Sequence, residues 1–350
     1  MILLITGGLG YIGSHVCVEL LKSGHDIIII DNLSNSSIHV LENIKKIVWL
    51  RKDLEDVHHH NNVIFYNGDV RDEAILSDIF KEHSIDAVLH FAGLKSVSES
   101  LDTPIEYYDV NISGGINLLN VMKKEKVKTI VFSSSAVVYG DSKSLPIKES
   151  TPLGDIKNPY GYSKLFFEQI LKNIYQSDPE WKVAILRYFN PVGAHPSGRI
   201  GENPNGIPNN LMPLITQVVM GKLDEVKVFG SDYPTIDGTG VRDYIHVVDL
   251  AIGHVAILNK LFSIPVTQVF VVNLGSGIGY SVLQMIKAYE KIVGRDIPYS
   301  ITKRREGDIA ESWTSIDYAN EFLGWRVERN LHQICLDTWN YEIKKLKKND

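Results

Sequence analysis

The chain of 350 residues contains only two cysteines, Cys17 and Cys335. Two thiols in so long a chain predict neither a disulfide framework nor a zinc site, so both are expected to be small apolar residues in a reducing environment. Three consecutive histidines at 58–60 could bind a metal ion, but no other candidate ligands are spaced to complete a site. A solvated loop is the favoured interpretation, and no metal is expected.

Long apolar runs and an excess of basic residues are also absent. No stretch approaches the ~18 apolar residues of a membrane-spanning helix, and the run Ile2–Ile5 is too short for the apolar core of a signal peptide. We therefore expect a cytoplasmic protein without a membrane partner. The formal net charge of -6 argues against nucleic acid as the main partner, although two or three well-placed arginines could still bind a small anion.

What is present is typical of a globular protein, with 44% hydrophobic and 22% charged residues. In the first half of the chain, short apolar runs alternate with helical patterns, which indicates a parallel sheet covered on both faces. The predicted fold class is therefore α/β, a doubly wound (Rossmann) sheet accompanied by a smaller mixed α/β substrate domain. The expected strands are 2–6, 27–31, 63–66, 87–91, 129–134 and 183–187.

The alternation breaks after Asn190, where residues 191–240 become rich in glycine, proline and asparagine. Loop chemistry of this kind often carries binding function. The last third mixes strands and helices less regularly. We expect a dinucleotide-binding domain at 1–188, to which part of 240–265 returns, and a substrate domain formed by 189–239 and 266–350.

A glycine-rich segment directly follows the first expected strand. Gly7, Gly10 and Gly13 repeat every third residue and open a helix, so they would allow a tight turn, close approach of a pyrophosphate, and packing of helix against strand. Asp31 ends the next strand. A carboxylate there can accept hydrogen bonds from the ribose hydroxyls of NAD and would repel the 2′-phosphate of NADP. This context predicts a site for NAD.

A second motif places Tyr160 and Lys164 four residues apart, on one face of a helix. Asn158-Pro159 signals the start of that helix, and the strand end Ser133-Ser134-Ser135 precedes it, whereas three other Tyr-x-x-x-Lys pairs lack this context. The lysine ammonium and the positive charge of a nicotinamide would both favour the phenolate form of Tyr160. The motif predicts that Tyr160 is a general base and that a serine relays the proton.

The order of these motifs resembles the extended short-chain dehydrogenase/reductase family. The resemblance runs from residue 1 to about 340 and is strongest to the branch of the family that epimerises UDP-hexoses at C4. The blocks that carry it are Phe91-Ala92-Gly93-Leu94-Lys95, Phe132-Ser133-Ser134-Ser135-Ala136, Arg187-Tyr188-Phe189-Asn190-Pro191-Val192-Gly193-Ala194-His195-Pro196, Asn209-Asn210-Leu211-Met212-Pro213, Gly240-Val241-Arg242-Asp243-Tyr244-Ile245-His246 and Arg304-Arg305-Glu306-Gly307-Asp308.

The resemblance assigns three sets of residues. Catalysis would fall to Ser135, Tyr160 and Lys164. The UDP-sugar would be held by Ser135, Asn190, Asn210, Arg242, Arg305, Asp308 and Ser312. The NAD site would be lined by Gly7, Gly10, Tyr11, Ile12, Gly13, Asp31, Asn32, Asn35, Ser36, Asp69, Val70, Phe91, Ala92, Gly93, Lys95, Asn111, Tyr160, Lys164 and Phe189.

The implied activity is interconversion of UDP-galactose and UDP-glucose through a 4-keto sugar, with NAD tightly bound and regenerated in each turnover. Family members restricted to plain hexoses often carry a bulky tyrosine at the position of Ser312. Members with a small residue there tend to accept N-acetylhexosamines as well. Activity on UDP-GalNAc and UDP-GlcNAc is therefore also expected.

Two other functions fit the same scaffold, and this chain departs from the pattern of each. A sugar-nucleotide 4,6-dehydratase or a UDP-glucuronate decarboxylase would carry carboxylates after the catalytic hydroxyl, where this chain has Ala136 and Val137. A non-enzymatic NAD-binding sensor would typically lose the Tyr160–Lys164 pair.

Helical stretches near 104–124 and 159–175 have wide apolar faces, which are paired across a dimer in family members, so a homodimer is expected.

Overall fold

The computed structural model describes residues 1–49, 62–204, 208, 210–265, 268–305 and 307–349. The histidines at 58–60 lie outside these residues. The chain divides into two compact units. The first unit is Met1–Gly140, Leu153–Tyr188 and Ala251–Val272, and the second is Asp141–Pro152, Phe189–Leu250 and Asn273–Asp350.

These units differ from the expected domains in two segments. Residues 141–152 join the second unit, while the described part of 266–272 joins the first; the part of 240–265 that returns to the first unit is 251–265. For the first of these segments the reason is a contact distant in sequence. Ile147 forms a parallel bridge with Thr314, and its backbone N–H donates to the carbonyl of Trp313 at 2.9 Å. A sequence pattern carries no signal for such a pairing.

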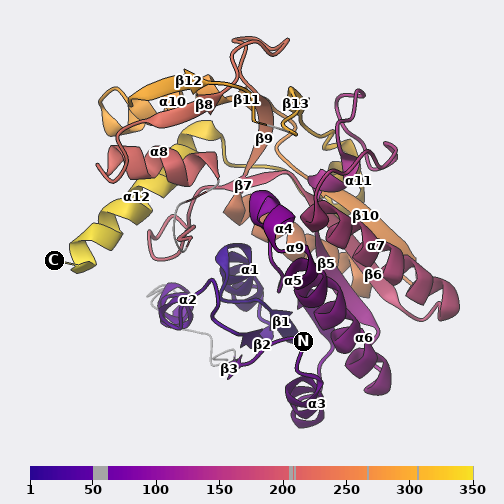
Figure 1. The fold of residues 1–350 in the computed structure, drawn as a ribbon. Helices are drawn as coiled ribbons and strands as arrows, with labels where there is room; N and C mark the ends of the chain where they lie inside the picture. Colours follow the sequence, from indigo (N-terminus) through magenta and orange to yellow (C-terminus); the bar gives the residue numbers. More distant parts are fainter. Residues whose placement is uncertain (50–61, 205–207, 209, 266–267, 306, 350) are drawn as a thin grey trace. The chain divides into compact units, whose positions relative to one another are not determined.

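The first unit is built on a seven-stranded sheet with the order β10-β6-β5-β4-β1-β2-β3 (Figure 1). Neighbouring pairs from β3 to β6 are parallel, and the order 3-2-1-4-5-6 is that of a dinucleotide-binding doubly wound fold. The prediction of a Rossmann sheet is confirmed. The strands are β1 (Ile2–Thr6), β2 (Asp26–Asp31), β3 (Val63–Asn67), β4 (Ala87–His90), β5 (Thr129–Ser135), β6 (Lys182–Tyr188) and β10 (Val269–Leu274).

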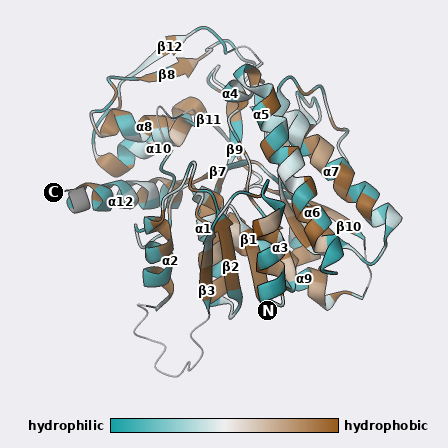
Figure 2. Cartoon of the chain, turned by 60° about the horizontal axis from the view of Figure 1, so that its bottom comes forward, coloured by the Kyte–Doolittle hydropathy of each residue, from teal (hydrophilic) through white to brown (hydrophobic). Residues whose placement is uncertain are grey.

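Helices flank this sheet and bury its apolar strands. Figure 2 shows the central strands as the most hydrophobic segments, in keeping with a parallel sheet that is covered on both faces. Leu4, Val88 and Ile130 on the strands pack with Leu118 and Phe167 on the helices. The helices are α1 (Tyr11–Lys22), α2 (His39–Trp49), α3 (Glu73–Glu82), α4 (Val97–Asp102), α5 (Pro104–Tyr108), α6 (Gly114–Lys124), α7 (Pro159–Ser177) and α9 (Val247–Ser263), with a π-helical turn at Asp109–Ser113 and a 3-10 turn at Ala136–Tyr139.

The second unit is organised around β9, which pairs in parallel with β7 and β13 and antiparallel with β11. A separate parallel pair joins β8 to β12. Its core includes Met212, Ile286, Tyr289 and Ile334. The elements are β7 (Asn190–Val192), α8 (Leu211–Val219), β8 (Val226–Phe229), β9 (Val241–His246), β11 (Gly279–Ser281), α10 (Val282–Val293), β12 (Tyr299–Thr302), β13 (Glu311–Ser312), α11 (Asp317–Leu323) and α12 (Leu331–Asn349).

Among the described residues, no helix combines the length and the apolar character that crossing a membrane requires.

Candidate active site

The glycine loop between β1 and α1 is packed so closely that side chains do not fit. Gly7 has φ +67°, and a Cβ built on it would lie 2.7 Å from the backbone nitrogen of Ala92. A Cβ on Gly13 would lie 2.3 Å from the carbonyl oxygen of Gly7. Both obstacles are backbone atoms, which cannot rotate away as a side chain can. The turn and the close approach of helix to strand therefore require glycine at these two positions.

Helix α1 begins on this loop with Gly10 as its N-cap, in extended conformation and without a side-chain cap. The first N–H groups of a helix lack intrahelical acceptors and, together with the helix dipole, attract anions. Tyr11 and Ile12 contribute the first helical residues. The backbone cradle fits the pyrophosphate of a dinucleotide.

Asp31, at the carboxyl end of β2, is buried and already engaged with its own loop. One carboxylate oxygen accepts the backbone N–H of Leu9 at 3.0 Å. The other accepts the N–H of Leu33 at 3.0 Å and the hydroxyl of Ser36 at 2.8 Å. A carboxylate offers about four lone-pair sites, so it retains capacity for a ribose hydroxyl. Asp31 therefore connects the glycine loop to the segment that follows β2.

The next polar group of this sheet edge is built around Asp69, which follows β3. Its carboxylate accepts Asn32 Nδ2 at 2.8 Å and Arg71 Nη2 at 2.8 Å. The hydrogen bonds from Arg71, with that of Asn32, hold the pKa of Asp69 at about 2. Asn32 and Asp69 thus lie together, and Val70 is buried directly after them. Of the other residues predicted here, Asn35 is exposed on the loop after β2.

Asn111, in the π-helical turn, acts as a clamp on the loop after β4. Its side chain both accepts the N–H of Leu94 at 2.8 Å and donates to the carbonyl of Leu94 at 3.0 Å. It also donates to Ser163 Oγ at 2.9 Å. These bonds hold Gly93 and Lys95 in place, and the ammonium of Lys95 lies 5.9 Å from the ring centre of Tyr11. Asn111 therefore fixes the backbone of the loop that follows β4.

Phe91 and Ala92 begin the same loop, directly after β4. Their backbone N–H groups donate to the carbonyl of Thr6 at 3.0 and 3.1 Å, which ties the loop to the end of β1. Phe189, the last residue predicted for the cofactor, is buried in the second unit and donates its N–H to the carbonyl of Leu274 at 3.1 Å.

The three predicted catalytic residues lie together in the first unit. Tyr160 and Lys164 are on α7, and Ser135 is at the end of β5, where its hydroxyl is close enough to the phenol of Tyr160 to lower the pKa of that phenol. The Lys164 ammonium lies 5.9 Å from the ring centre of Tyr160 and donates to the carbonyl of Ser133 at 2.8 Å. This arrangement brings the hydroxyl at the end of β5 to a phenol and an ammonium that are one turn apart on α7.

Burial dominates the titration of this group. It raises the pKa of the Tyr160 phenol above its ordinary value, and the neighbouring hydroxyl of Ser135 opposes the shift. Burial also lowers the pKa of Lys164 to about 8. The sequence predicted that Lys164 favours the phenolate. In the protein alone, desolvation outweighs any such effect, so the phenolate needs a further positive charge nearby.

Apart from Ser135, the residues predicted to bind the UDP-sugar lie in the second unit, where two of them are paired. Arg242 on β9 donates to Asp308 at 3.1 Å, and both side chains are partly exposed. The guanidinium of Arg305 stacks 4.5 Å from the ring centre of Phe229, at the end of β8. Ser312 on β13 is the register partner of Arg242. Arg242 is thus adjacent to Asp308 and Ser312, and Arg305 is adjacent to Phe229.

Two predicted residues show other local partners. Asn190 begins β7, is exposed, and pairs with Tyr244 in the register of β9. Asn210 precedes α8 and donates to Glu202 at 2.8 Å. Sequence reasoning missed Phe229, although an aromatic residue that ends a short strand before a glycine in a loop-rich region is a recognisable signal. A buried Tyr233 lies nearby, with Arg304 stacked 4.1 Å from its ring centre.

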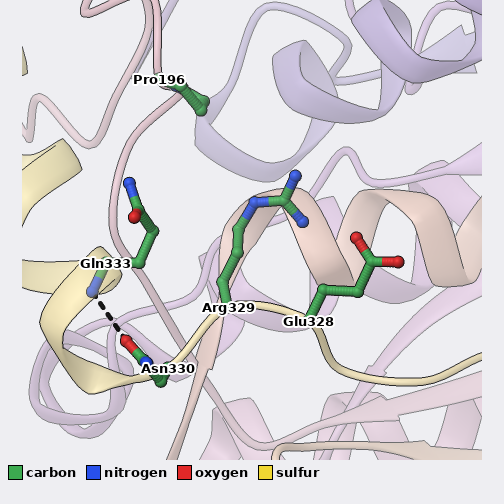
Figure 3. Close-up of a pocket in the computed structure, with 5 residues that line it drawn as sticks. All are labelled: Pro196, Glu328, Arg329, Asn330 and Gln333. Atoms are coloured by element: carbon green, nitrogen blue, oxygen red, sulfur yellow. Dashed lines mark hydrogen bonds between the residues drawn. The ribbon is translucent and has the colours of Figure 1, made fainter.

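A pocket of about 350 Å³ in the second unit contains none of the predicted residues (Figure 3). It is lined by Pro196, Glu328, Arg329, Asn330 and Gln333. Arg329 is held there by Asp249, which accepts hydrogen bonds from its guanidinium and its backbone N–H.

The described residues include no group of three or more histidine, cysteine or acidic side chains placed to bind a metal ion. The cysteines are buried, and burial raises the pKa of both thiols.

Comparison with known proteins places this geometry in a family. Residues 3–275 match the model of the NAD dependent epimerase/dehydratase family. A UDP-glucose 4-epimerase of Bacillus subtilis is 53% identical over 342 residues, which cover 98% of this chain and 97% of that protein.

Solved structures give the same result. A UDP-glucose 4-epimerase of Bifidobacterium longum, in complex with NAD+ and UDP, is 51% identical, with a TM-score of 0.92 and 99% of each chain covered. A UDP-Glc/GlcNAc 4-epimerase of Campylobacter jejuni is 32% identical, with a TM-score of 0.82 over 98% of this chain and 99% of that one. The chain belongs to the NAD dependent epimerase/dehydratase family.

Proposed function

We propose that this protein is a UDP-glucose 4-epimerase that interconverts UDP-galactose and UDP-glucose with a tightly bound NAD. The observation that carries the proposal is the placement of the Ser135 hydroxyl beside the buried phenol of Tyr160, with Lys164 one helical turn away. Ser135 ends β5 of the sheet that also carries the glycine cradle. The full-length similarity to UDP-glucose 4-epimerases supports the same activity.

Different residues would bind different parts of NAD. The backbone at Gly10, Tyr11 and Ile12 would bind the pyrophosphate, and Asp31 would accept a ribose hydroxyl. The group around Asp69 would border the adenosine, together with Asn32, Asn35, Ser36 and Val70. The loop Phe91–Lys95 would face the rest of the cofactor. NAD supplies the acceptor and donor of a hydride and, in its oxidised form, a positive charge on the nicotinamide.

Tyr160 would take the proton from the sugar's 4-hydroxyl through Ser135 or directly, as C4 is oxidised. Because burial raises the pKa of Tyr160, the positive charge of the nicotinamide makes proton removal possible near neutral pH. The 4-keto sugar then presents its other face, and Tyr160 returns the proton as C4 is reduced. Lys164 would hold the nicotinamide ribose and contribute positive charge.

The second unit would anchor the UDP while the sugar reacts. Arg242 and Arg305 can bind diphosphate oxygens, since a guanidinium fork matches phosphate geometry. The stacking of Arg305 on Phe229 and the bond from Arg242 to Asp308 hold both cations in defined positions. Asn190, Asn210 and Ser312 complete the proposed substrate set. The dehydratase and decarboxylase alternatives need carboxylates at Ala136 and Val137, where none exist.

Proton NMR of the purified protein with UDP-galactose and no added NAD tests the proposal. Appearance of UDP-glucose would support both the reaction and a retained cofactor. Tyr160→Phe should abolish conversion without loss of bound NAD, and Ser135→Ala should lower kcat. Absence of conversion by protein that demonstrably contains NAD would refute the proposal.

Ser312 supports a wider substrate range. Its small side chain is half-buried on β13, in register with Arg242, so an acetamido group would meet a hydroxymethyl group and not an aromatic ring. We expect conversion of UDP-GalNAc to UDP-GlcNAc. Ser312→Tyr should remove this activity and leave that on UDP-galactose within about threefold. Failure of the unsubstituted enzyme to convert UDP-GalNAc, with UDP-galactose active, would contradict the assignment.

A homodimer is also proposed. Apolar side chains remain exposed on α4, α5 and α7 of the first unit, including Leu101 at 60%, Ile105 at 83% and Phe166 at 48%. Contiguous apolar surface on helices favours association. Light scattering should give twice the mass of 39.3 kDa, and Ile105→Glu should shift it toward one copy. A monomer at micromolar concentration would rule the dimer out. The cytoplasmic location stays a prediction.

A further inference from the structure

Three consecutive residues of β5 face three residues on one side of α7. The carbonyl of Ser133 accepts Lys164 Nζ at 2.8 Å, and the hydroxyl of Ser135 lies near enough to the phenol of Tyr160 to lower its pKa. Between them, Ser134 Oγ donates to Glu168 Oε1 at 2.6 Å. Tyr160, Lys164 and Glu168 are spaced by four residues, so they lie one above another on the helix. The contacts of Ser133 and Ser135 belong to the catalytic group, whereas the hydrogen bond between Ser134 and Glu168 belongs to no assigned function.

The hydrogen bond between Ser134 and Glu168 is held in place by a buried ion pair. Arg187, on β6, donates to both carboxylate oxygens of Glu168, from Nε at 2.9 Å and from Nη2 at 2.6 Å. It also donates from Nη1 to the hydroxyl of Tyr139 at 2.9 Å. Ser134 and Arg187 are register partners on neighbouring strands. Glu168 is 0% exposed and Arg187 is 2% exposed. Strand β5, strand β6 and helix α7 are therefore joined at one point.

Stability alone does not account for this arrangement. A buried ion pair loses the hydration of two charges, and apolar residues of similar volume often serve stability equally well. A bidentate pair is directional, however, and fixes the distance and orientation of the elements that carry it. Here the fixed elements are the strand and the helix that bring Ser135 to Tyr160.

We infer that Ser134, Glu168 and Arg187 are positioning residues for the reaction: the Glu168–Arg187 pair holds β5 in register with α7 and keeps the charge around Tyr160 balanced. The inference rests on the proposed epimerase function. Removing either charge would leave the other one buried. Glu168 lies two helical turns, or about 12 Å, along α7 from Tyr160, and Arg187 is bonded to it. A unit charge at that distance shifts a pKa by about one unit when the effective dielectric constant is about 20.

Other titratable groups also lie near Tyr160 and the Glu168–Arg187 pair, but Glu168 and Arg187 remain the pair of opposite charges. On α7 these are Lys164 and Lys172, the latter 3.9 Å from Glu168. On β4, burial holds the pKa of His90 at about 3, so it is neutral. On β6, burial raises the pKa of Tyr188, whose hydroxyl bonds His254 of α9. Tyr139 of the 3-10 turn contacts Arg187 through its hydroxyl and its ring.

The test compares Glu168→Gln, Arg187→Met and the double variant on the holoenzyme. Glu168→Gln leaves the Arg187 cation, which favours phenolate, so the acid limb of kcat/KM should move down by about 0.5–1 pH unit. Arg187→Met leaves the Glu168 anion and should move the limb up. The shift should be similar in size but reduced by the Lys172 ammonium, which lies 3.9 Å from Glu168. The double variant removes both charges and should return the limb to its original position.

Further measurements separate this role from a merely structural one. Ser134→Ala, which keeps both charges, should lower kcat about three- to tenfold with KM for UDP-galactose changed less than twofold. Tyr139→Phe removes a bond to the same Arg187 without loosening β5 from α7, and should leave kcat within about twofold. Ultraviolet titration of the phenolate, with Tyr160→Phe as the blank, should reproduce the two opposite shifts without turnover.

The outcomes are distinct from those of the proposed function. If the unsubstituted enzyme does not epimerise, the proposed function fails. If it does, and both single variants lose activity with an unmoved or equally moved acid limb, the inference is overturned. Should Arg187→Met fail to fold, a downward shift in Glu168→Gln that is reversed in the double variant still supports it, and no reversal refutes it.

Discussion

Replacing Lys164 by methionine should stabilise the protein at neutral pH. Burial lowers the pKa of Lys164 from its ordinary 10.5 to about 8. A shift of about 2.5 units corresponds to about 3 kcal/mol by which the buried ammonium destabilises the folded state. Methionine has a similar length and no charge, but it leaves the carbonyl of Ser133 without its donor, a loss of about 1 kcal/mol. The net gain at pH 7 is about 2 kcal/mol.

The gain should disappear at high pH, and this dependence identifies its cause. Between pH 8 and 10.5 the folded protein binds fewer protons at Lys164 than the unfolded chain does, so the free energy of unfolding rises with pH. At pH 9.5 the unsubstituted protein has recovered about 2 kcal/mol, and the two proteins should be about equally stable. Below pH 8 the full difference should be present.

Urea unfolding of nucleotide-free protein at pH 7 and pH 9.5 measures both quantities. Lys124→Met, at the exposed end of α6, is the control and should change stability by the same small amount at both pH values. The reasoning is refuted if Lys164→Met is less stable than the parent at pH 7, or if its advantage is unchanged at pH 9.5. Loss of epimerase activity in this variant would add that the lysine is retained for function at a cost in stability.

Two further predictions concern packing. Gly13→Ala should destabilise the protein by about 1–3 kcal/mol and release NAD from the purified protein, since its Cβ would lie 2.3 Å from the Gly7 carbonyl oxygen; Gly24→Ala, where φ is +84° but space is open, should cost about 1 kcal/mol and retain NAD. Thermal unfolding and the nucleotide content measure both effects. Tyr233→Phe should be neutral or raise stability by about 1 kcal/mol, because its buried hydroxyl has no hydrogen-bond partner among the described residues. Tyr107→Phe should instead lower stability by about 1–3 kcal/mol, because that hydroxyl accepts the Ser96 N–H and donates to a glutamate; equal effects of the two substitutions would contradict this reasoning.

The parts of the molecule that the sequence predicted are those with local signals. The parallel sheet follows from continuous apolar strands that alternate with amphipathic helices. The glycine loop places Gly7, Gly10 and Gly13 between strand and helix because strand, turn and helix are contiguous in the chain. Tyr160 and Lys164 share a face of α7 because helical spacing brings them together.

The remaining features depend on partners distant in sequence. Asn111 bonds Leu94, which is 17 residues before it, and Ser163, which is 52 residues after it. Glu168 meets Ser134 across 34 residues. Such contacts depend on the packing of helices on strands, which leaves no periodic trace in the sequence. The titration of Tyr160 could not be predicted either, because it depends on how completely the fold removes water from the phenol.

The hydrogen bonds of Asp31 have a consequence for cofactor engineering. A change of preference from NAD to NADP usually begins with removal of the acidic residue at this position, to make room for a phosphate. In this protein the same carboxylate fixes Leu9 of the glycine loop and Leu33 and Ser36 of the following segment. A redesigned chain would need new hydrogen-bond acceptors for those three groups as well as a basic side chain for the phosphate, so a single substitution at Asp31 should yield a weaker NAD site before it yields an NADP site.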